Sequence, residues 1–295
     1  MENIISLLVT GLMIGGVYGL VALGMVVVYK STGILNLMHG MAMVLMGYLA
    51  YALMVTMGVP LVVSLLVIIV FSGLLYYGIQ WVTIRPLIGQ PILATVMMTF
   101  ALNFLFLAII TYQWSELQLK LPSFIPTGRW LVGGVSLLKE RTVSFVATLL
   151  LFGGVGLFFR YTKLGLGMRA VADNSVITES TGVNVRQIFA YSWVVCGVIG
   201  AITAILLSSI YDVLPGWGVF ALSKGLPIML LGGLESLPGA LIGGMIVGVA
   251  EVFGTTYIDP LVGGGFRDII PFILMLLILL FKPWGLFGWE RIERV

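Results

Sequence analysis

The chain has 295 residues, of which 60% are hydrophobic and 9% are charged. Soluble domains carry about 25% charged residues, so this composition excludes a soluble fold and indicates a membrane protein. The formal net charge of +3 comes from 15 basic residues that are spread between apolar stretches. Because they form no basic patch or stripe, the charge argues against nucleic acid as a partner.

The first two thirds of the chain contain six stretches that are long and apolar enough, or nearly so, to form membrane-spanning helices. A span needs about 20 apolar residues. The predicted spans lie near residues 4–29, 34–56, 61–84, 91–115, 142–159 and 187–211. The residues before the first span include no basic group, and its apolar run is longer than a signal-peptide core. We therefore expect a first helix that is retained rather than cleaved.

The last third of the chain is more fragmented. Leu226–Gly233 is too short to span alone, Glu235–Pro238 interrupts it, and Gly239–Ala250 resumes the apolar pattern. Short segments interrupted by Gly and Pro are typical of broken or re-entrant helix pairs in transporters. A final span covers Ile269–Phe281 and begins a few residues earlier. The sequence predicts one all-α, polytopic membrane domain over 1–295, with about eight transmembrane helices, one of them broken or re-entrant.

Two polar segments separate the predicted spans and orient them. Segment 113–141 contains prolines and is expected to be an external loop, whereas segment 160–187 has the composition of a surface helix. Nine Lys and Arg residues fall on the side of segment 160–187 and six on the other. The positive-inside rule therefore places segment 160–187 and the C-terminus in the cytoplasm and the N-terminus outside.

Glycines four residues apart form flat stripes on two of the predicted segments. The three motifs are Gly11-xxx-Gly15-xxx-Gly19, Gly239-xxx-Gly243 and Gly244-xxx-Gly248. Such stripes allow helix backbones to approach closely in lipid. We expect them to serve helix packing within one subunit rather than a dedicated dimer interface, although both uses are compatible.

Asn36 and the only histidine, His39, lie at the start of the second predicted span. Their spacing places them on one helical face. Polar groups in a span usually face the bundle interior or a water-filled path, so the pair is a candidate for the translocation path or its gating. The alternative is that the pair ties two helices together by hydrogen bonds. The sequence provides no nearby His or Cys partner for zinc.

The sequence has no Gly-x-x-x-x-Gly-Lys-Ser/Thr loop, so we expect any ATP to be bound by another polypeptide. It also lacks a Ser–His–Asp or paired-carboxylate set, which disfavours an intramembrane enzyme. The main alternative is an ion-coupled secondary transporter or channel, which should have ionisable groups well inside its spans. The predicted spans are almost free of them, and the nearest carboxylates, Glu235 and Glu251, fall near segment ends.

Three blocks of sequence resemble the permease family of branched-chain amino acid ABC transporters, specifically the first of its two permease subunits. The first block is Gly33–Gly40, and the third is the glycine-rich stretch from Gly232 to Glu251. The second block resembles the family's ATPase-contacting loop and contains Arg169, Ala170, Ala172, Asp173, Asn174 and Gly182. The likeness covers nearly the whole chain.

The resemblance implies a multi-subunit importer in the bacterial inner membrane. It would contain a similar second permease forming a heterodimer, two cytoplasmic ATPases that bind ATP and Mg, and an external substrate-binding protein. No cofactor is expected on this chain, which would be a transport subunit and not an enzyme. The family imports branched-chain amino acids, and relatives carry urea, short amides or other small organic solutes, so the solute is left open.

The sequence of segment 160–187 predicts a short helix over Ala170–Thr181 that docks on another protein. An isolated helix of this length is marginal in water, and Gly182 suits a left-handed helix end. Arg169 and Asp173 are four residues apart and are expected to pair. Solvent exposure does not explain three apolar residues of the segment: Val171, Ile177 and Val183. The alternative is that the segment folds back on its own subunit.

Overall fold

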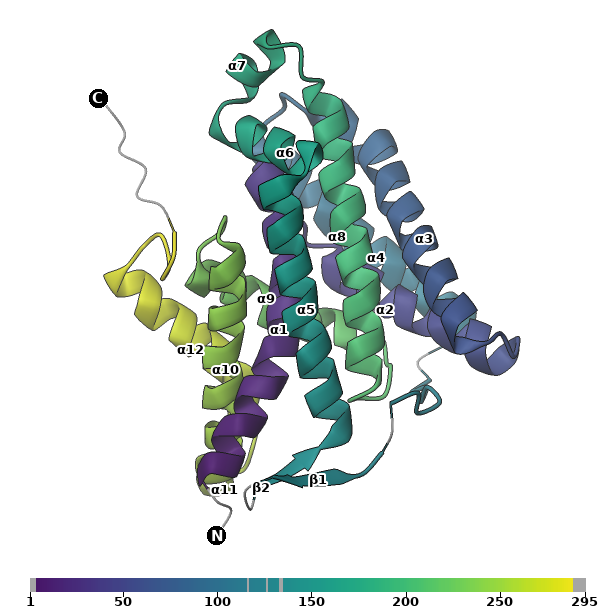
Figure 1. Ribbon diagram of the computed structural model, residues 1–295, viewed down its shortest axis with the longest axis vertical. Helices are drawn as coiled ribbons and strands as arrows, with labels where there is room; N and C mark the ends of the chain where they lie inside the picture. The colour runs from purple at the N-terminus through teal and green to yellow at the C-terminus, as the bar shows by residue number, and fades with distance from the viewer. Residues whose placement is uncertain (1–3, 116, 126, 133–134, 289–295) are drawn as a thin grey trace.

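The computed structural model describes residues 4–115, 117–125, 127–132 and 135–288. Within these ranges, seven helices are long and apolar enough to cross a membrane (Figure 1). They are α1 (Ile4–Thr32), α2 (His39–Tyr51) with its π-helical extension Ala52–Thr56, α3 (Leu61–Ile79) with its continuation to Leu87, α4 (Ile92–Trp114), α5 (Lys139–Tyr161), α8 (Val185–Ser208) and α10 (Leu237–Tyr257). With the shorter apolar helix α9 (Trp217–Gly232), they confirm the predicted all-α membrane fold of about eight helices.

The remaining elements lie at the ends of the bundle or on its side. The apolar helix α12 (Phe266–Phe281) packs on α9 and α10, and the short helix α11 (Asp259–Val262) precedes it. Two short helices, α6 (Lys163–Asp173) and α7 (Ser175–Ser180), cap one end. In the described residues the only sheet is the antiparallel hairpin of β1 (Arg129–Val132) and β2 (Val135–Leu138) at the opposite end. This hairpin lies within segment 113–141.

Helix α1 is the central helix of the bundle. It contacts α5, α8, α9 and α10 and is the most thoroughly buried of the spans (Figure 1). By contrast, only about a third or fewer of the residues in the apolar parts of α3, α4 and α5 are buried within the chain. Because water would not tolerate so much exposed apolar area, these outer faces are covered by lipid or by another subunit.

Two helices begin inside the molecule rather than at its ends. α2 was predicted from residue 34, but residues 33–36 are not helical and the helix begins at His39. His39 packs against Gly24 of α1, about 12 Å along that helix from its end at Thr32. The start of α9 lies beside it, because a Cβ on Gly40 would collide with the Gly218 carbonyl oxygen. Non-helical backbone at this depth is tolerated where protein buries it.

The fragmented segment of the sequence differs most from its prediction. α9 begins at Trp217, well before Leu226, and Gly239–Ala250 is part of the full-length helix α10. The break between them is the turn after Gly233, whose positive φ of 106° suits glycine. The charges Lys224 and Glu251, which interrupt the apolar pattern, lie within these helices.

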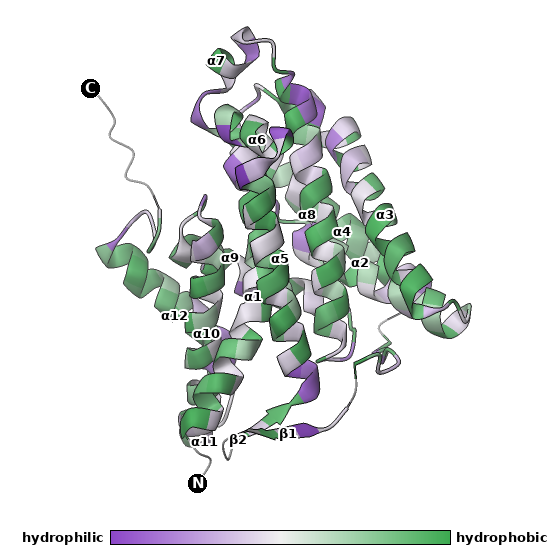
Figure 2. Ribbon diagram, viewed as in Figure 1, coloured by the Kyte–Doolittle hydropathy of each residue, from purple (hydrophilic) through white to green (hydrophobic). Residues whose placement is uncertain are grey.

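Hydropathy divides the molecule into an apolar middle and two polar ends (Figure 2). The end with α6 and α7 carries seven described Lys and Arg residues: Lys30, Arg85, Arg160, Lys163, Arg169, Arg186 and Lys282. Arg291 and Arg294, also counted on that side in the sequence, lie outside the described residues. The hairpin end carries four: Lys120, Arg129, Lys139 and Arg141. Lys224 and Arg267 were counted at this end, but both belong to helices and join a buried network.

Candidate functional site

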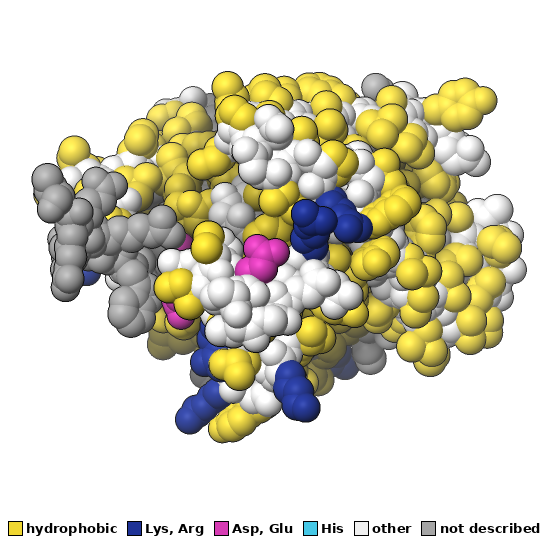
Figure 3. Space-filling model, turned by 90° about the horizontal axis from the view of Figure 1, so that it is seen from above, with side chains coloured by type: hydrophobic (Ala, Val, Ile, Leu, Met, Phe, Trp, Pro, Cys, Tyr) yellow, Lys and Arg dark blue, Asp and Glu magenta, His cyan; other side chains and the backbone are white. Residues whose placement is uncertain are grey.

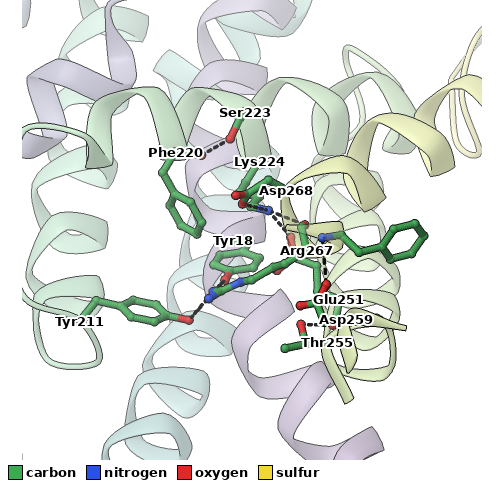
Figure 4. A network of polar contacts seen from close by, with 11 residues as sticks. Tyr18, Tyr211, Phe220, Ser223, Lys224, Glu251, Thr255, Asp259, Arg267 and Asp268 are labelled. Atoms are coloured by element: carbon green, nitrogen blue, oxygen red, sulfur yellow. Dashed lines mark hydrogen bonds and ion pairs between the residues drawn. The ribbon is translucent and has the colours of Figure 1, made fainter. Parts of the chain in front are cut away.

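A network of charged side chains crosses three helices in the interior of the bundle (Figure 4). The Lys224 ammonium of α9 lies 2.5 Å from Oε1 of Glu251 in α10. Nε of Arg267, at the start of α12, lies 3.4 Å from the other oxygen of the same carboxylate. The Lys224 and Glu251 side chains are 0% and 3% exposed. Glu251 therefore compensates two positive charges that would be costly to bury alone.

Two tyrosines hold the Arg267 guanidinium from the opposite side. Its Nη2 donates to the hydroxyl of Tyr18 at 2.7 Å and to that of Tyr211 at 3.0 Å. Phe220 lies under both cations, with its ring centre 5.1 Å from Lys224 Nζ and 5.6 Å from the Arg267 guanidinium carbon. These contacts join α1, α9, α10 and α12 with the chain after α8 through one polar centre.

This network corrects the expectation that the spans are almost free of ionisable groups. Glu251 lies inside α10 and not near a segment end, and Lys224 lies inside α9. Their mutual neutralisation is what allows the helices to continue through them. A sequence search that ends each span at a charge cannot find such a pair. The available signal was an acidic and two basic residues, each alone in an apolar stretch.

A cavity of about 560 Å³ leads from the hairpin end of the molecule to this network. Its walls come from the first half of α1, the second half of α10, and β2. Its α1 wall runs from Ser6 to Tyr18, which corresponds to a depth of about 18 Å. Glu251 and Arg267 line its inner part, and Arg129 and Arg141 also line it. The cavity therefore reaches the middle of α1 from one end of the bundle.

Asn36 and His39 lie in a different buried cluster. They do not share a helical face as predicted, because α2 begins only at His39, yet both contact Cys196 of α8. His39 Nδ1 lies 2.7 Å from the Tyr76 hydroxyl of α3 and 3.3 Å from Cys196 Sγ. Asn36 Nδ2 lies 3.7 Å from the same sulfur. This arrangement ties α2, α3 and α8 together, as in the alternative role proposed for the pair, and its place in a path or gate stays a prediction.

The comparison with known proteins decides the family. Residues 7–279 match the family described as the branched-chain amino acid transport system / permease component. The chain belongs to this family. It is thus a permease component of a transport system and a multi-pass membrane protein.

Several relatives of this permease are similar over nearly their whole length. The high-affinity branched-chain amino acid transport system permease protein BraD of Pseudomonas aeruginosa is 33% identical, over 98% of this chain and 97% of its own. The corresponding LivH of Escherichia coli (strain K12) is 27% identical, over 97% and 96%. A chain of PsaBC from Streptococcus pneumoniae, in complex with Fab, matches with a TM-score of 0.51 at 12% identity, over 94% of this chain and 92% of that one. This last likeness concerns the fold alone.

The glycine motifs of the permease face one another inside the chain. A Cβ on Gly15 would collide with the backbone of Gly244, and one on Gly248 with that of Gly11. Gly19 faces Ala240 of α10. The other α10 motif faces α9: Gly239 lies against Gly232, and Gly243 against Ile228. The two stripes of α10 thus serve two neighbours, which explains the adjacent Gly243-Gly244 pair.

The predicted coupling segment of the permease is two helices rather than one. Asn174 ends α6 and caps α7, because its side chain accepts a hydrogen bond from the Ile177 amide at 3.0 Å. Gly182 follows with a φ of +86°, the left-handed conformation expected for it. Arg169 does not pair with Asp173 and instead donates to the Arg160 carbonyl oxygen at 3.5 Å.

The apolar residues of this segment divide between the subunit and the surface. Val171 was expected to belong to a helix that docks on another protein, but it is buried at 5% exposure against α1, α5 and α8 residues of its own chain, as in the alternative. Val183 packs against the same cluster. Ile177 is 62% exposed and Val176, which was not singled out, is 75% exposed. α6 therefore folds back on its own subunit, whereas α7 presents two apolar side chains outward.

A concave surface adjoins α7 at the same end. Its lining comes from Lys30 at the end of α1, from residues 169 and 171–175, and from Glu235 in the turn between α9 and α10. The Lys30 ammonium donates to the Glu235 carbonyl oxygen at 3.0 Å, which fixes one rim. Seen from this end, a few basic side chains and fewer acidic ones stand out among hydrophobic and uncharged surface (Figure 3). The remaining loop residues Ala170, Ala172, Asp173 and Asn174 all lie in α6 or at the joint between α6 and α7.

Proposed function

We propose that this chain is one of two permease subunits of an ATP-driven importer in the bacterial inner membrane, which moves branched-chain or related amino acids into the cell. The observation that carries the proposal is the family match over residues 7–279, together with a relative named for branched-chain amino acid transport that is matched over 97% of its own length. The proposed assembly contains a second, similar permease, two cytoplasmic ATPases with ATP and Mg, and an external substrate-binding protein.

The helix α7 supports docking of an ATPase at the end that carries it. A six-residue helix is too short to be stable alone in water. Val176 and Ile177 nevertheless project outward from it beside this concave surface, whose lining carries charges of both signs. A groove on an ATPase subunit would bury these two side chains, and movement of that subunit on ATP binding would be transmitted through α6 to α1 and α8. We place Ala170, Ala172 and Asp173 in this coupling element.

The distribution of basic residues supports a cytoplasmic location for the α6–α7 end. Seven described Lys and Arg residues lie there and four at the hairpin end, once Lys224 and Arg267 are assigned to the interior. The positive-inside rule then places the hairpin outside, where an external binding protein would deliver its solute to the mouth of the 560 Å³ cavity. The C-terminal residues 289–295, proposed to be cytoplasmic, lie outside the described residues.

Purification through a tag on this chain tests the proposed assembly. In a mild detergent, we expect two ATPase chains and one further permease to co-purify with it and to hydrolyse ATP. The variant Ile177→Glu adds a charge to the proposed contact and should lower ATPase recovery several-fold. The control Leu131→Glu changes a side chain that is 81% exposed at the opposite end and should leave recovery unchanged.

The same preparation distinguishes the importer from an ion-coupled transporter. Recovery of the chain without any ATPase, or equal ATPase recovery from Ile177→Glu and Leu131→Glu, contradicts the proposed coupling surface. Solute uptake that follows an imposed ion gradient and ignores ATP would favour the ion-coupled alternative.

A further inference from the structure

The outer cavity has the features of a ligand site rather than a packing defect. Its volume of about 560 Å³ lies within the range of about 300–1,000 Å³ that is typical of small-molecule pockets. Its described lining combines apolar side chains with hydroxyls and a few charges. Leu7, Ile14, Leu137 and Val252 represent the apolar part. Its inner part lies near the middle of α1, the depth at which transporters place their substrate sites.

The charges of the cavity favour an anionic group. Three arginines, Arg129, Arg141 and Arg267, line it together with a single carboxylate, Glu251. That carboxylate is already bound by Lys224 at 2.5 Å and is 3% exposed. Arg267 is the innermost cation and its side chain is 37% exposed, so it faces the space of the cavity. A positively charged ligand would meet mainly repulsion here, whereas an anion would be attracted along the whole cavity.

The guanidinium of Arg267 has donors left for a ligand. Nε faces Glu251, and Nη2 donates to Tyr18 and Tyr211. Within the part of the chain that the structure describes, Nη1 has no hydrogen-bond partner. Its two N–H groups are therefore available to donate charge-assisted hydrogen bonds to a carboxylate oxygen. The network holds Arg267 rigidly, which lowers the entropic cost of binding.

We propose that Arg267 binds the carboxylate of the transported solute in this cavity, while the apolar wall formed by α1, β2 and α10 accepts an aliphatic side chain. The proposal rests on the proposed function and assigns it a solute-binding site. Amino acids with apolar side chains combine the required carboxylate with the required aliphatic group. Their ammonium group, which the three arginines would repel, would be accepted by hydroxyls of the lining such as those of Thr255 and Thr256. Glu251 holds Arg267 in position. When no solute is bound, the Glu251 carboxylate also neutralises part of the positive charge at the inner end of the cavity.

Cysteine protection tests this site directly. Thr10 lines the cavity and is partly buried, whereas Ser123 is exposed at the same end outside it. Thr10→Cys and Ser123→Cys are labelled in nanodiscs with an anionic methanethiosulfonate reagent, and the native chain, whose Cys196 is buried, gives the background. Leucine should slow labelling of Thr10→Cys at least several-fold and leave Ser123→Cys unchanged. The decarboxylated analogue of leucine should protect neither.

A second comparison assigns the effect to the guanidinium. Adding Arg267→Gln to Thr10→Cys should raise the protective leucine concentration by about tenfold or more, the effect of losing a charge-assisted contact. Adding Lys139→Gln, which changes a cation at the same end outside the cavity lining, should not. If leucine and its decarboxylated analogue protect Thr10→Cys equally, or neither protects it, the proposal is wrong, even if Arg267→Gln fails to fold.

Uptake by the purified assembly separates this proposal from the proposed function. If the assembly imports leucine with ATP while leucine fails to protect Thr10→Cys, the cavity is not the binding site and the importer remains. If leucine protects Thr10→Cys but the assembly imports no amino acid, the site remains and the proposed function fails. Protection that appears only with a bound external protein and no leucine would mean that the cavity binds that protein, which also overturns the proposal.

Discussion

At the scale of single residues, the buried charges of this permease are interdependent. Removing the Glu251 charge would leave the Lys224 ammonium, 0% exposed, with only the Asp268 carboxylate, which lies 3.5 Å away and is 72% exposed. Breaking a buried pair in this way costs about 3–5 kcal/mol. We expect Glu251→Gln to lower the thermal unfolding midpoint of the purified chain strongly. The double variant Lys224→Met/Glu251→Leu removes both of these charges and should recover much of the loss, because Arg267, which also loses Glu251, is 37% exposed and can be hydrated. If the double variant is less stable than Glu251→Gln, the pair is not a mutually compensating unit.

Gly244 lies where two helix backbones are in direct contact. Its hydrogen faces the backbone of Gly15 and Gly19 in α1, so any side chain there would separate the two helices. We expect Gly244→Val to prevent recovery of folded chain or to destabilise it by several kcal/mol, in the range of severe core changes. Gly153→Val in α5 is the matched control, because a Cβ there meets nothing within 4 Å. Fluorescence-detected gel filtration after heating compares them, and equal midpoints would contradict the packing.

At the scale of elements, α6 and α7 show how a surface segment is divided between support and contact. α6 buries Met168 and Val171 against the bundle, whereas α7 depends on the Asn174 cap and on the left-handed Gly182. A β-branched residue at a positive φ costs about 1–3 kcal/mol, whereas Asn tolerates that conformation better. Gly182→Val should therefore reduce ATPase recovery and solute-stimulated hydrolysis, with membrane insertion retained, and Gly182→Asn should reduce them less. Full recovery with Gly182→Val would remove this segment from the coupling role.

The helices that were well predicted are those whose apolar runs are bounded by charge, such as α1, α4 and α8. The sequence placed them within a few residues, because a membrane span follows from hydropathy alone. It failed at α2, where the mostly apolar segment 33–36 before His39 is non-helical, a conformation that is tolerated within a membrane protein where other parts of the protein bury the backbone. It failed again at α9 and α10, where the partner of each charge lies on another helix. Pairings of this kind depend on tertiary structure, which local patterns do not contain.

The candidate site, like the helices, could be predicted only in part from the sequence. Asn36, His39 and the glycine stripes stand out as residue types, so the sequence marked them, but only the structure shows that they contact other parts of the same chain. The network around Arg267 was missed entirely. Its members come from four distant stretches, and Tyr18 and Tyr211 have no local signal that distinguishes them from other aromatic residues in a membrane helix or loop.

At the scale of the whole molecule, the proposed orientation assigns the α6–α7 end to the cytoplasm and the hairpin end to the outside. Ser175 is exposed at the start of α7, and Cys196 is buried in α8. In intact cells, a membrane-impermeant thiol reagent should leave the native chain and Ser175→Cys unlabelled, whereas Ser123→Cys should react. After inversion of the membrane the two introduced cysteines should exchange behaviour. Labelling of Ser175→Cys from outside would reverse the proposed orientation.

We propose that this chain forms part of an ATP-driven path for amino acids. The most direct test of this proposal is uptake of radiolabelled leucine by proteoliposomes that contain the assembly purified through this chain, with the external binding protein on the outside and ATP inside. We predict accumulation that requires hydrolysable ATP, fails with a non-hydrolysable analogue, and falls several-fold with Ile177→Glu. Leucine accumulation that is equally fast without ATP would contradict this proposal. So would an assembly that hydrolyses ATP but accumulates no amino acid.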